Sequence, residues 1–215
     1  MEYQAPKSKC SLCNSEFARK GMTRHVKSCL SEHFQKISKG KSVPLLYLNI
    51  SDTHNPDYFL HLLISENSTL RVLDTFLRNI WLECCGHMSA FSYRRYGDEI
   101  KLSRKIGDVF GPGTALNYQY DFGSTTELSV KAIECFFGTT EKNKKVQIVA
   151  RNAQPLIPCD GCNSEPAVQI CTVCQWDGRG WLCKECFENH ACEEDMFLPV
   201  VNSPRTGVCG YTGND

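Results

Sequence analysis

The 215-residue sequence predicts an α+β fold, with a central, mainly antiparallel sheet, one long helix and two small zinc-stabilised modules. Three observations predict it. Apolar and polar residues alternate along 116–122, which is the period of a strand covered on one face. Apolar residues recur along 70–81 at the spacing of an amphipathic helix. Most of the 14 cysteines gather toward the two ends of the chain, largely in Cys-x2-Cys pairs, which are typical of small metal-bound modules.

We therefore expect three parts: a basic Cys-Cys-His-Cys zinc finger with a linker at 1–42, an α+β domain at 43–155, and a two-zinc cross-brace module with an acidic tail at 156–215. Their charges differ, although the whole chain has no net charge. Residues 1–42 carry nine Lys or Arg against three Asp or Glu, and residues 156–215 carry three against nine. The first part therefore suits polyanions, and the last part suits basic peptides.

The first module depends on a Cys-x2-Cys pair that is followed by His-x3-Cys. Its ligands are Cys10, Cys13, His25 and Cys29. The stretch 21–30 can form a helix, which places the last two ligands on one face at i and i+4. The set resembles a ββα zinc finger whose last His is replaced by Cys, and this implies a structural zinc ion. Four basic residues surround the helix: Arg19, Lys20, Arg24 and Lys27. They can meet phosphates, so DNA or RNA contact is one hypothesis. Residues 36–41 form a short linker.

The central part begins with two strands, at 45–50 and 58–64, joined by a turn at 55–57. Ser68 or Thr69 caps the helix that follows. The apolar face of this helix consists of Leu70, Leu73, Leu77, Ile80 and Trp81. Further strands are expected at 90–93, 99–102, 116–122, 128–137 and 146–149. One face of the alternating strand carries Leu116, Tyr118, Tyr120 and Phe122. These strands predict a sheet built mainly on antiparallel pairing.

The run 116–123, Leu-Asn-Tyr-Gln-Tyr-Asp-Phe-Gly, resembles the Tyr-x-Tyr-Asp-Phe-Gly signature of the plasmid pRiA4b open-reading-frame-three-like family, TnpR-like passengers of insertion elements. The helix ending at Trp81, with His87 and Phe91 after it, also fits that family. The resemblance covers 43–150 and implies an α+β fold without a well-established activity. The family continues with Asp-x-Trp-x-His after the glycine and this chain does not, so no metal or acid–base role is carried over.

The residues of this central signature also have a plain interpretation. Tyr118 and Tyr120 cover a sheet face, and Asp121 bonds the backbone of the following turn. The alternative is a functional cleft lined by Tyr120, Asp121 and His87. Three cysteines of this part are interpreted as ordinary core thiols: Cys84, Cys85 and Cys135. The first two are adjacent in sequence, and adjacent cysteines cannot easily share one tetrahedral ion.

The last module contains three Cys-x2-Cys pairs closed by a His-x-Cys. Its ligands are Cys159, Cys162, Cys171, Cys174, Cys183, Cys186, His190 and Cys192. Eight ligands make two tetrahedra. We expect an interleaved arrangement, in which the first and third pairs hold one ion and the second pair holds the other with His190 and Cys192. A segment poor in apolar residues is stabilised most when each ion ties distant positions together. Cys209 competes with Cys192 for the eighth place.

Zinc is the expected ion, at about three per chain, because thiolate-rich tetrahedral sites suit it. The alternatives are a disulfide framework, iron or an iron–sulfur cluster, and a redox dithiol. The module resembles ZZ-type and B-box zinc fingers in its pair spacing, in Pro166, and in Leu-Cys-Lys-Glu-Cys-Phe at 182–187 followed by His190, although it lacks the second His of the ZZ pattern. That resemblance implies a two-zinc layout that binds other proteins.

Together these features favour a non-enzymatic, cytoplasmic zinc protein that acts as a macromolecular interaction module. A protein would bind to the acidic end, and DNA or RNA is the alternative partner, for residues 1–42. No membrane partner is expected, because no stretch approaches the roughly 18 apolar residues of a membrane span. The rival function is a mobile-element hydrolase or nuclease that uses a central cleft. Its candidate acids are Asp98, Glu99, Asp108 and Asp121.

Overall fold

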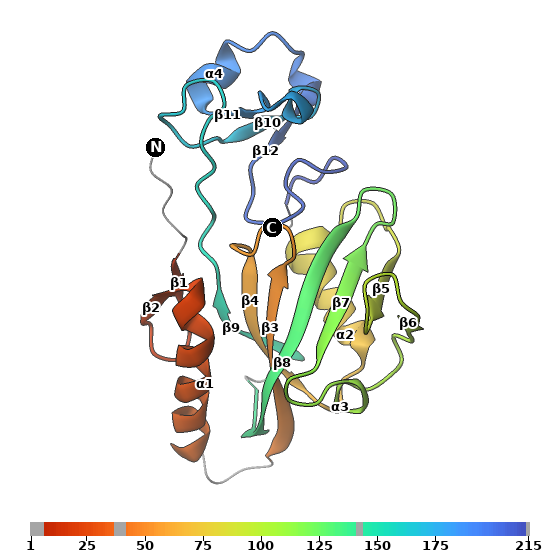
Figure 1. Ribbon diagram of the computed structural model, residues 1–215. Coiled ribbons are helices and arrows are strands. Elements are labelled where there is room, and N and C mark those ends of the chain that lie inside the picture. Colours follow the sequence, from red (N-terminus) through yellow and green to blue (C-terminus); the bar gives the residue numbers. More distant parts are fainter. Residues whose placement is uncertain (1–6, 37–41, 141–143, 214–215) are drawn as a thin grey trace.

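Alternating apolar residues build a seven-stranded sheet at the centre of the protein (Figure 1). The computed structural model describes residues 7–36, 42–140 and 144–213. The strand order is β6-β5-β7-β8-β3-β4-β9, and all neighbouring strands are antiparallel. The strands are β3 (Val43–Asp52), β4 (Phe59–Ser65), β5 (Ser89–Ser92), β6 (Glu99–Ile100), β7 (Ala115–Tyr120), β8 (Thr126–Gly138) and β9 (Val146–Arg151). The α+β class and the antiparallel sheet predicted from the sequence are confirmed.

The strand predicted at 116–122 is β7, and it ends at Tyr120, two residues earlier than its alternation suggests. Asp121 adopts a left-handed backbone conformation with a φ of 65°. Its carboxylate accepts a hydrogen bond from the N–H of Gly123 at 3.0 Å, as the plain interpretation of this residue requires. The chain therefore turns before Phe122, whose side chain is exposed. The prediction that Phe122 shares the buried face with Tyr118 is wrong for this reason.

One face of the sheet is covered by the helix predicted at 70–81. It is an α-helix, α2 (Leu70–Leu77), that continues as a π-helical turn, Arg78–Leu82. Thr69 precedes α2 as predicted, but its side chain makes no capping hydrogen bond. Instead, the first N–H groups of α2 donate to backbone carbonyls of the 102–104 segment, at 2.9 Å. A short helix, α3 (Ile106–Val109), closes the same core.

The other face of the sheet is covered, over β3, β4, β8 and β9, by the helix of the N-terminal finger (Figure 1). This finger consists of the hairpin β1 (Lys7–Lys9) and β2 (Glu16–Ala18) and the helix α1 (Arg19–Lys36). Met22, Val26 and Leu30 are fully buried against this face. The helix is longer than the predicted 21–30, because its apolar face continues along the sheet. The predicted linker lies almost wholly in 37–41, outside the described residues.

The C-terminal module lies beyond one end of the sheet (Figure 1). Its elements are β10 (Gln169–Cys171), a 3-10 turn at Cys174–Asp177, β11 (Trp181–Leu182), α4 (Lys184–Glu188), a 3-10 turn at Glu194–Met196 and β12 (Phe197–Pro199). The chain then returns to the sheet as a tail, which we define as residues 200–213. The Ser203 hydroxyl donates to the carbonyl of Trp81 at 2.6 Å. The Arg205 guanidinium donates to the carbonyl of Ser124, in the turn between β7 and β8, at 2.9 Å. The tail is therefore packed on the central domain.

Among the helices that the structure describes, none is long and apolar enough to span a bilayer.

Candidate metal centres

Four groups of Cys and His side chains come together in the described part of the chain, and within each group the ligand atoms lie within 4.8 Å of one another. The groups are Cys10, Cys13, His25 and Cys29; Cys159, Cys162, Cys183 and Cys186; Cys171, Cys174, His190 and Cys192; and Cys84, Cys85, His87 and Cys209. We call them the finger group, the first and second module groups, and the tail group. All 14 cysteines are free thiols, so the disulfide alternative finds no support in the structure.

The distances within the groups suit a tetrahedral ion. Ligand atoms at about 2.0–2.3 Å from a zinc ion lie about 3.5–3.8 Å from each other, whereas a disulfide requires about 2.0 Å. In the two module groups the sulfur–sulfur distances are 3.8 Å for Cys162 and Cys183, and 3.7 Å for Cys174 and Cys192. These groups therefore have the size of a four-coordinate metal site.

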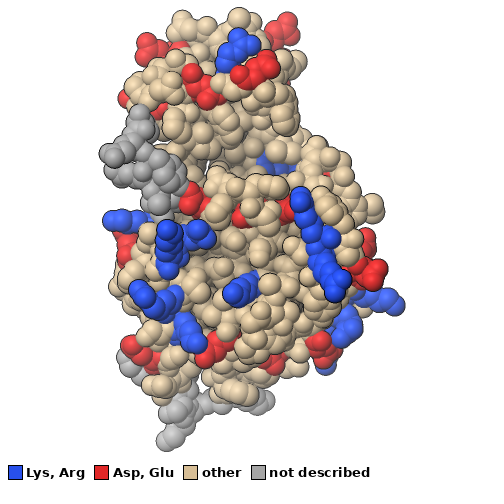
Figure 2. Space-filling view, viewed as in Figure 1, with Lys and Arg blue, Asp and Glu red and all other residues tan. Residues whose placement is uncertain are grey.

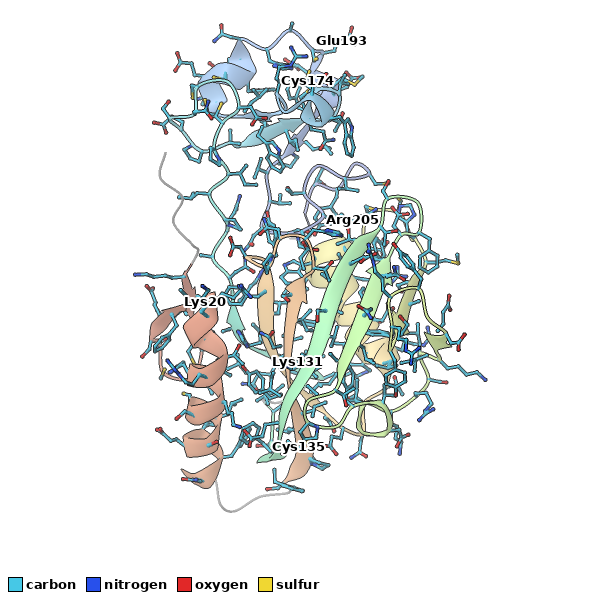
Figure 3. The ribbon with its side chains drawn as sticks, in the orientation of Figure 1. Lys20, Lys131, Cys135, Cys174, Glu193 and Arg205 are labelled. Atoms are coloured by element: carbon cyan, nitrogen blue, oxygen red, sulfur yellow. The ribbon has the colours of Figure 1, made fainter. Side chains whose placement is uncertain are left out.

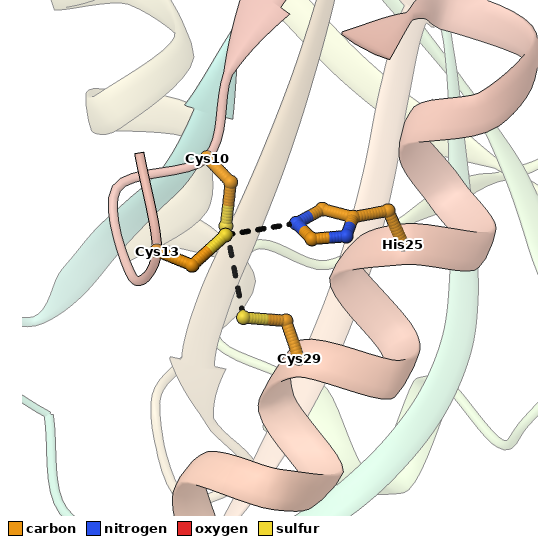
Figure 4. Close-up of side chains that lie close together, drawn as sticks. All are labelled: Cys10, Cys13, His25 and Cys29. Atoms are coloured by element: carbon orange, nitrogen blue, oxygen red, sulfur yellow. Dashed lines mark hydrogen bonds between the residues drawn. The ribbon is translucent and has the colours of Figure 1, made fainter. Parts of the chain in front are cut away.

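The finger group is positioned by β1, the turn after it, and one face of α1 (Figure 4). The sulfurs of Cys10 and Cys29 lie 4.0 Å apart, and the Cys13 sulfur lies 3.2 Å from His25 Nε2. His25 and Cys29 project from adjacent turns of the helix, as the i and i+4 spacing predicts. The ring of Phe17 stacks on the His25 imidazole at 4.2 Å and holds its orientation.

Both the finger group and the first module group begin with the same turn, Cys-x2-Cys-Asn-Ser, which ligand spacing alone does not reveal. The N–H of the asparagine, Asn14 or Asn163, donates to the carbonyl of the first cysteine at 2.8–2.9 Å. Both asparagines have positive φ angles, 63° and 56°, a conformation that asparagine tolerates better than most residues. The repeated Asn-Ser after each pair is the sequence signal that could have identified this turn.

The serine of this turn stabilises the thiolate form of the second cysteine. Hydrogen bonds from the side chain and backbone of Ser15 lower the pKa of Cys13 to about 6. Ser164 does the same for Cys162, whose pKa is also about 6. The thiolate is the form that binds a metal. These two serines therefore support the ligands from outside the coordination sphere.

Other thiols of the same groups have raised pKa values, because a thiolate that forms there lies close to the thiolates of neighbouring cysteines. Burial and the charge of Cys10 raise the pKa of Cys29 to about 12. Interactions with Cys159 and Cys183 raise the pKa of Cys186 to about 12. Without a cation the members of a group cannot all be charged together. A bound divalent ion removes this conflict.

The second module group contains a buried polar atom that a bound metal ion would satisfy. His190 Nε2 is buried and has no hydrogen-bond partner in the described part of the chain. Leaving such an atom unsatisfied is costly, and coordination of a metal would satisfy it. The imidazole is held by an edge-on contact with Phe197, with ring centres 5.4 Å apart.

The two module groups have the interleaved composition expected from the sequence. The first and third Cys-x2-Cys pairs come together, and the second pair lies with His190 and Cys192. Cys209 is not in either module group, so the structure places Cys192, and not its competitor, beside His190. Gly161 explains part of the fit, because a Cβ at this position would lie 2.9 Å from the Cys186 sulfur.

The tail group was not anticipated. Cys84 and Cys85 were interpreted as core thiols, but Cys85 is exposed and its sulfur lies 3.6 Å from that of Cys84. Ligand spacing could not reveal this group, because Cys209 lies 122 residues after His87. Among the cysteines, Cys135 alone stays outside the four groups of the described chain; it is half-buried against the sheet core.

The residues of the alternative central cleft also lie together, but the buried guanidinium of Arg205 contacts two of them, Tyr120 and Asp121. His87 Nε2 is 3.6 Å from Asp121 Oδ2, and its ring meets Tyr120 edge-on at 5.7 Å. Asp121 Oδ2 is bound by Arg205 at 2.5 Å, and the Arg205 side chain is fully buried. None of the four groups found among the described residues includes a carboxylate. The acids proposed for a hydrolase, Asp98, Glu99, Asp108 and Asp121, are therefore not brought together as a metal-binding set.

Comparison with known proteins identifies no family for this chain. No family model matches the chain, and no curated protein matches it. Among solved structures, the chain is similar to the crystal structure of a protein of unknown function, MM3350 from Methanosarcina mazei Go1, at 16% sequence identity and a TM-score of 0.43. The match covers 54% of this chain and 72% of that chain. A similarity at this level assigns neither a family nor a function.

Proposed function

We propose that this is a non-enzymatic zinc protein that acts as a macromolecular interaction module. The observation that carries the proposal is that the finger group and both module groups each offer four protein ligands. Four protein ligands leave no open position for a substrate, which is the pattern of structural and not of catalytic zinc. Thiolate and imidazole ligands at tetrahedral distances favour zinc over magnesium or calcium. Three ions then hold the finger and the C-terminal module.

The acidic C-terminal module is the proposed site for a protein partner. Its Trp176 side chain is 82% exposed and lies in the same 3-10 turn, Cys174–Asp177, as the Cys174 ligand. Trp176 and Asp195 line a groove of about 700 Å³ between the module and the tail. An exposed tryptophan beside a carboxylate suits a Lys or Arg side chain, through cation–π contact and charge. Glu193, which Figure 3 shows on the same module, is a further exposed acid. The partner is therefore a basic segment of another protein.

Fluorescence anisotropy with two labelled peptides of equal length, one rich in lysine and one rich in glutamate, tests this site. We expect the lysine-rich peptide alone to bind at low salt, and Trp176→Ala to weaken it by about tenfold, as for an interface residue of this type. Phe137→Ala is the matched control, because Phe137 is a similarly exposed aromatic residue, at 71%, on β8 of the sheet. Equal binding of both peptides, or equal weakening by both variants, would contradict the proposal.

The basic finger is a second candidate surface, for DNA or RNA. Lys20, Arg24 and Lys27 are exposed along α1, and Figure 2 shows Lys and Arg side chains gathered on the side of the molecule where this helix lies. Lys27 is partly engaged by Glu134 at 3.3 Å. Binding of this kind comes from phosphate contacts and weakens strongly with salt.

An electrophoretic shift assay at low and high salt separates the two partners. A shift at low salt that disappears at high salt, and that is lost in Lys20→Glu/Arg24→Glu, would support the nucleic-acid surface. Lys101→Glu/Lys105→Glu makes the same charge change at exposed positions far from α1 and should leave the shift in place. The absence of a shift with DNA and with RNA at low salt would remove this surface from the proposal.

Two further assignments belong to the proposal. The resemblance of residues 43–150 to the plasmid pRiA4b open-reading-frame-three-like family is kept as a proposed membership. Fourteen free thiols favour a reducing compartment such as the cytoplasm.

A further inference from the structure

We propose that the tail group, Cys84, Cys85, His87 and Cys209, is a fourth metal site, which takes a divalent thiophilic ion of the zinc class and latches the C-terminal tail onto the central sheet. This goes beyond the proposed function, which requires only the finger and module ions. It concerns how the parts of the molecule are joined.

The geometry is that of a metal site in spite of the adjacent cysteines. The Cys85 sulfur lies 3.6 Å from that of Cys84 and 3.7 Å from that of Cys209. His87 Nε2 lies 3.3 Å from the Cys209 sulfur and 2.9 Å from the Cys85 sulfur. The two sulfur–sulfur separations match the edge of about 3.5–3.8 Å expected for a zinc tetrahedron, and the nitrogen–sulfur separations are shorter. Three thiols and one imidazole thus present four ligand atoms to one point.

The loop that carries three of these ligands is held in place by groups that bind no metal. The Glu83 carboxylate accepts the N–H of Gly86 at 2.6 Å and the Tyr120 hydroxyl at 3.1 Å, and it pairs with Arg78 at 2.7 Å. Gly86 has a φ of 78°, which reverses the chain so that His87 faces the two cysteines before it. The first three ligands are therefore pre-organised on the end of the π-helical turn.

The fourth ligand arrives from the tail together with a buried positive charge. Cys209 has a φ of 52°, and it follows Arg205, which is fully buried. The Arg205 guanidinium binds Asp121 at 2.5 Å and the Ser124 carbonyl at 2.9 Å. Figure 3 shows Arg205 where the tail meets the end of the sheet.

This buried charge suits a metal complex of the expected composition. Three thiolates, a neutral imidazole and a divalent ion carry a net charge of about −1. His87 Nε2 lies 3.6 Å from Asp121, the partner of Arg205. The guanidinium therefore lies beside two negative charges, the carboxylate and the metal complex. A buried cation requires such compensation.

An ion here would join parts of the chain that are far apart in sequence. Cys85 and Cys209 are 124 positions apart, and the whole C-terminal module lies between them. The same Cys209 helps to line the groove that contains Trp176. The ion would thus fix the C-terminal end of the module to the central domain, while its other end follows β9 in the chain. Loss of the ion would free one wall of the groove.

The tail group is also the most accessible of the four. Two of its ligands, Cys85 and Cys209, are exposed and none is buried, whereas each of the other three groups has at least one buried ligand. We therefore expect its ion to be the first that a chelator removes.

Metal counting on the full-length protein tests the site directly. Co²⁺ replaces zinc and reports each thiolate site by its absorption, so we expect wild-type protein to saturate at four ions and Cys209→Ser at three. Cys135→Ser is the matched control and should still saturate at four, because Cys135 belongs to none of the groups. A wild-type count of three, unchanged by Cys209→Ser, would overturn the fourth site and leave the proposed function intact.

Hydrogen–deuterium exchange tests the latch. In Cys209→Ser, and independently in His87→Ala, amide exchange in the tail should rise at least tenfold while exchange in β3 and β8 stays unchanged. The unchanged strands show that the variant is folded. Loss of one ion without faster exchange in the tail would overturn the latch, and a general rise in all strands would show that the site is needed for the fold as a whole and not as a latch.

Discussion

At the scale of single residues, the two serines that follow the Cys-x2-Cys-Asn turns determine how readily their cysteines ionise. Ser15 and Ser164 occupy equivalent places in the finger group and the first module group. Each lowers the pKa of the neighbouring cysteine to about 6. They make no bond to a metal in this arrangement, and they act on it through the ligand.

We expect Ser164→Ala to weaken metal binding in the first module group by about tenfold, because residues that support ligands typically contribute about 10- to 100-fold to metal affinity. Competition with a chromophoric chelator measures the change. Ser31→Ala is the control, since its hydroxyl donates only to the carbonyl of Lys27 on α1. Equal affinities in Ser164→Ala and in the control would show that the hydrogen bond is unimportant.

His61 is a second residue with a measurable consequence. It is fully buried on β4, and its Nδ1 lies 2.7 Å from the Tyr47 hydroxyl. Burial lowers its pKa to about 3. In the unfolded chain it takes up a proton near pH 6.5, so the unfolded state binds more protons below that pH. The free energy of unfolding must therefore fall as pH drops from about 6.5 toward 3.

Urea unfolding at pH 7.5 and pH 5.5 measures the contribution of His61 to the pH dependence of stability. Between the two pH values we expect the wild-type protein to lose about 1.4 kcal/mol more stability than His61→Gln, which has no titrating ring. Loss of metal at the lower pH affects both proteins and cancels in the comparison. The same pH dependence in both proteins would mean that His61 is protonated in the folded state.

At the scale of elements, the docking of α1 on the sheet makes the finger part of the central core. Its apolar face shares a cluster with residues of β3, β4, β8 and β9. Close to the end of the helix, the ring of Phe34 lies directly over Gly138 of β8. A Cβ at Gly138 would collide with this ring, so the close approach of helix and strand depends on glycine.

Gly138→Ala should therefore destabilise the protein by about 1–3 kcal/mol, as overpacking usually does. Chemical denaturation measures the loss. The same substitution at Gly21 on α1 is the control, because its Cβ would meet Phe17 at an ordinary 3.6 Å and alanine favours a helix. Phe34→Leu should recover part of the loss in a double variant. If Gly138→Ala is neutral, the helix does not pack on β8 as described.

At the scale of the whole molecule, the sequence predicts those features that depend on residues close together in the chain. The interleaving of the module ligands followed from their spacing, and the strands followed from alternation. The extension of α1 to Lys36 could not be foreseen, because it depends on packing against the sheet. The tail group was missed for the same reason, since Cys209 meets His87 only in the folded chain.

The finger and the C-terminal module depend on bound metal to different degrees, because they bury different amounts of apolar surface. The finger helix has an apolar core to rest on, whereas the C-terminal module has three short strands and little buried apolar surface. Its order must come from its ligands. Removal of metal should therefore affect the module before it affects the central sheet.

Native mass spectrometry of the full chain, combined with hydrogen–deuterium exchange before and after chelation, tests this account most directly. We predict at least three bound zinc ions, each displacing protons from its thiols, and a large increase in exchange across 159–192 when the ions are removed, while β3, β4 and β8 stay protected. A chain that carries fewer than three ions, or whose C-terminal module exchanges equally slowly without them, would contradict it.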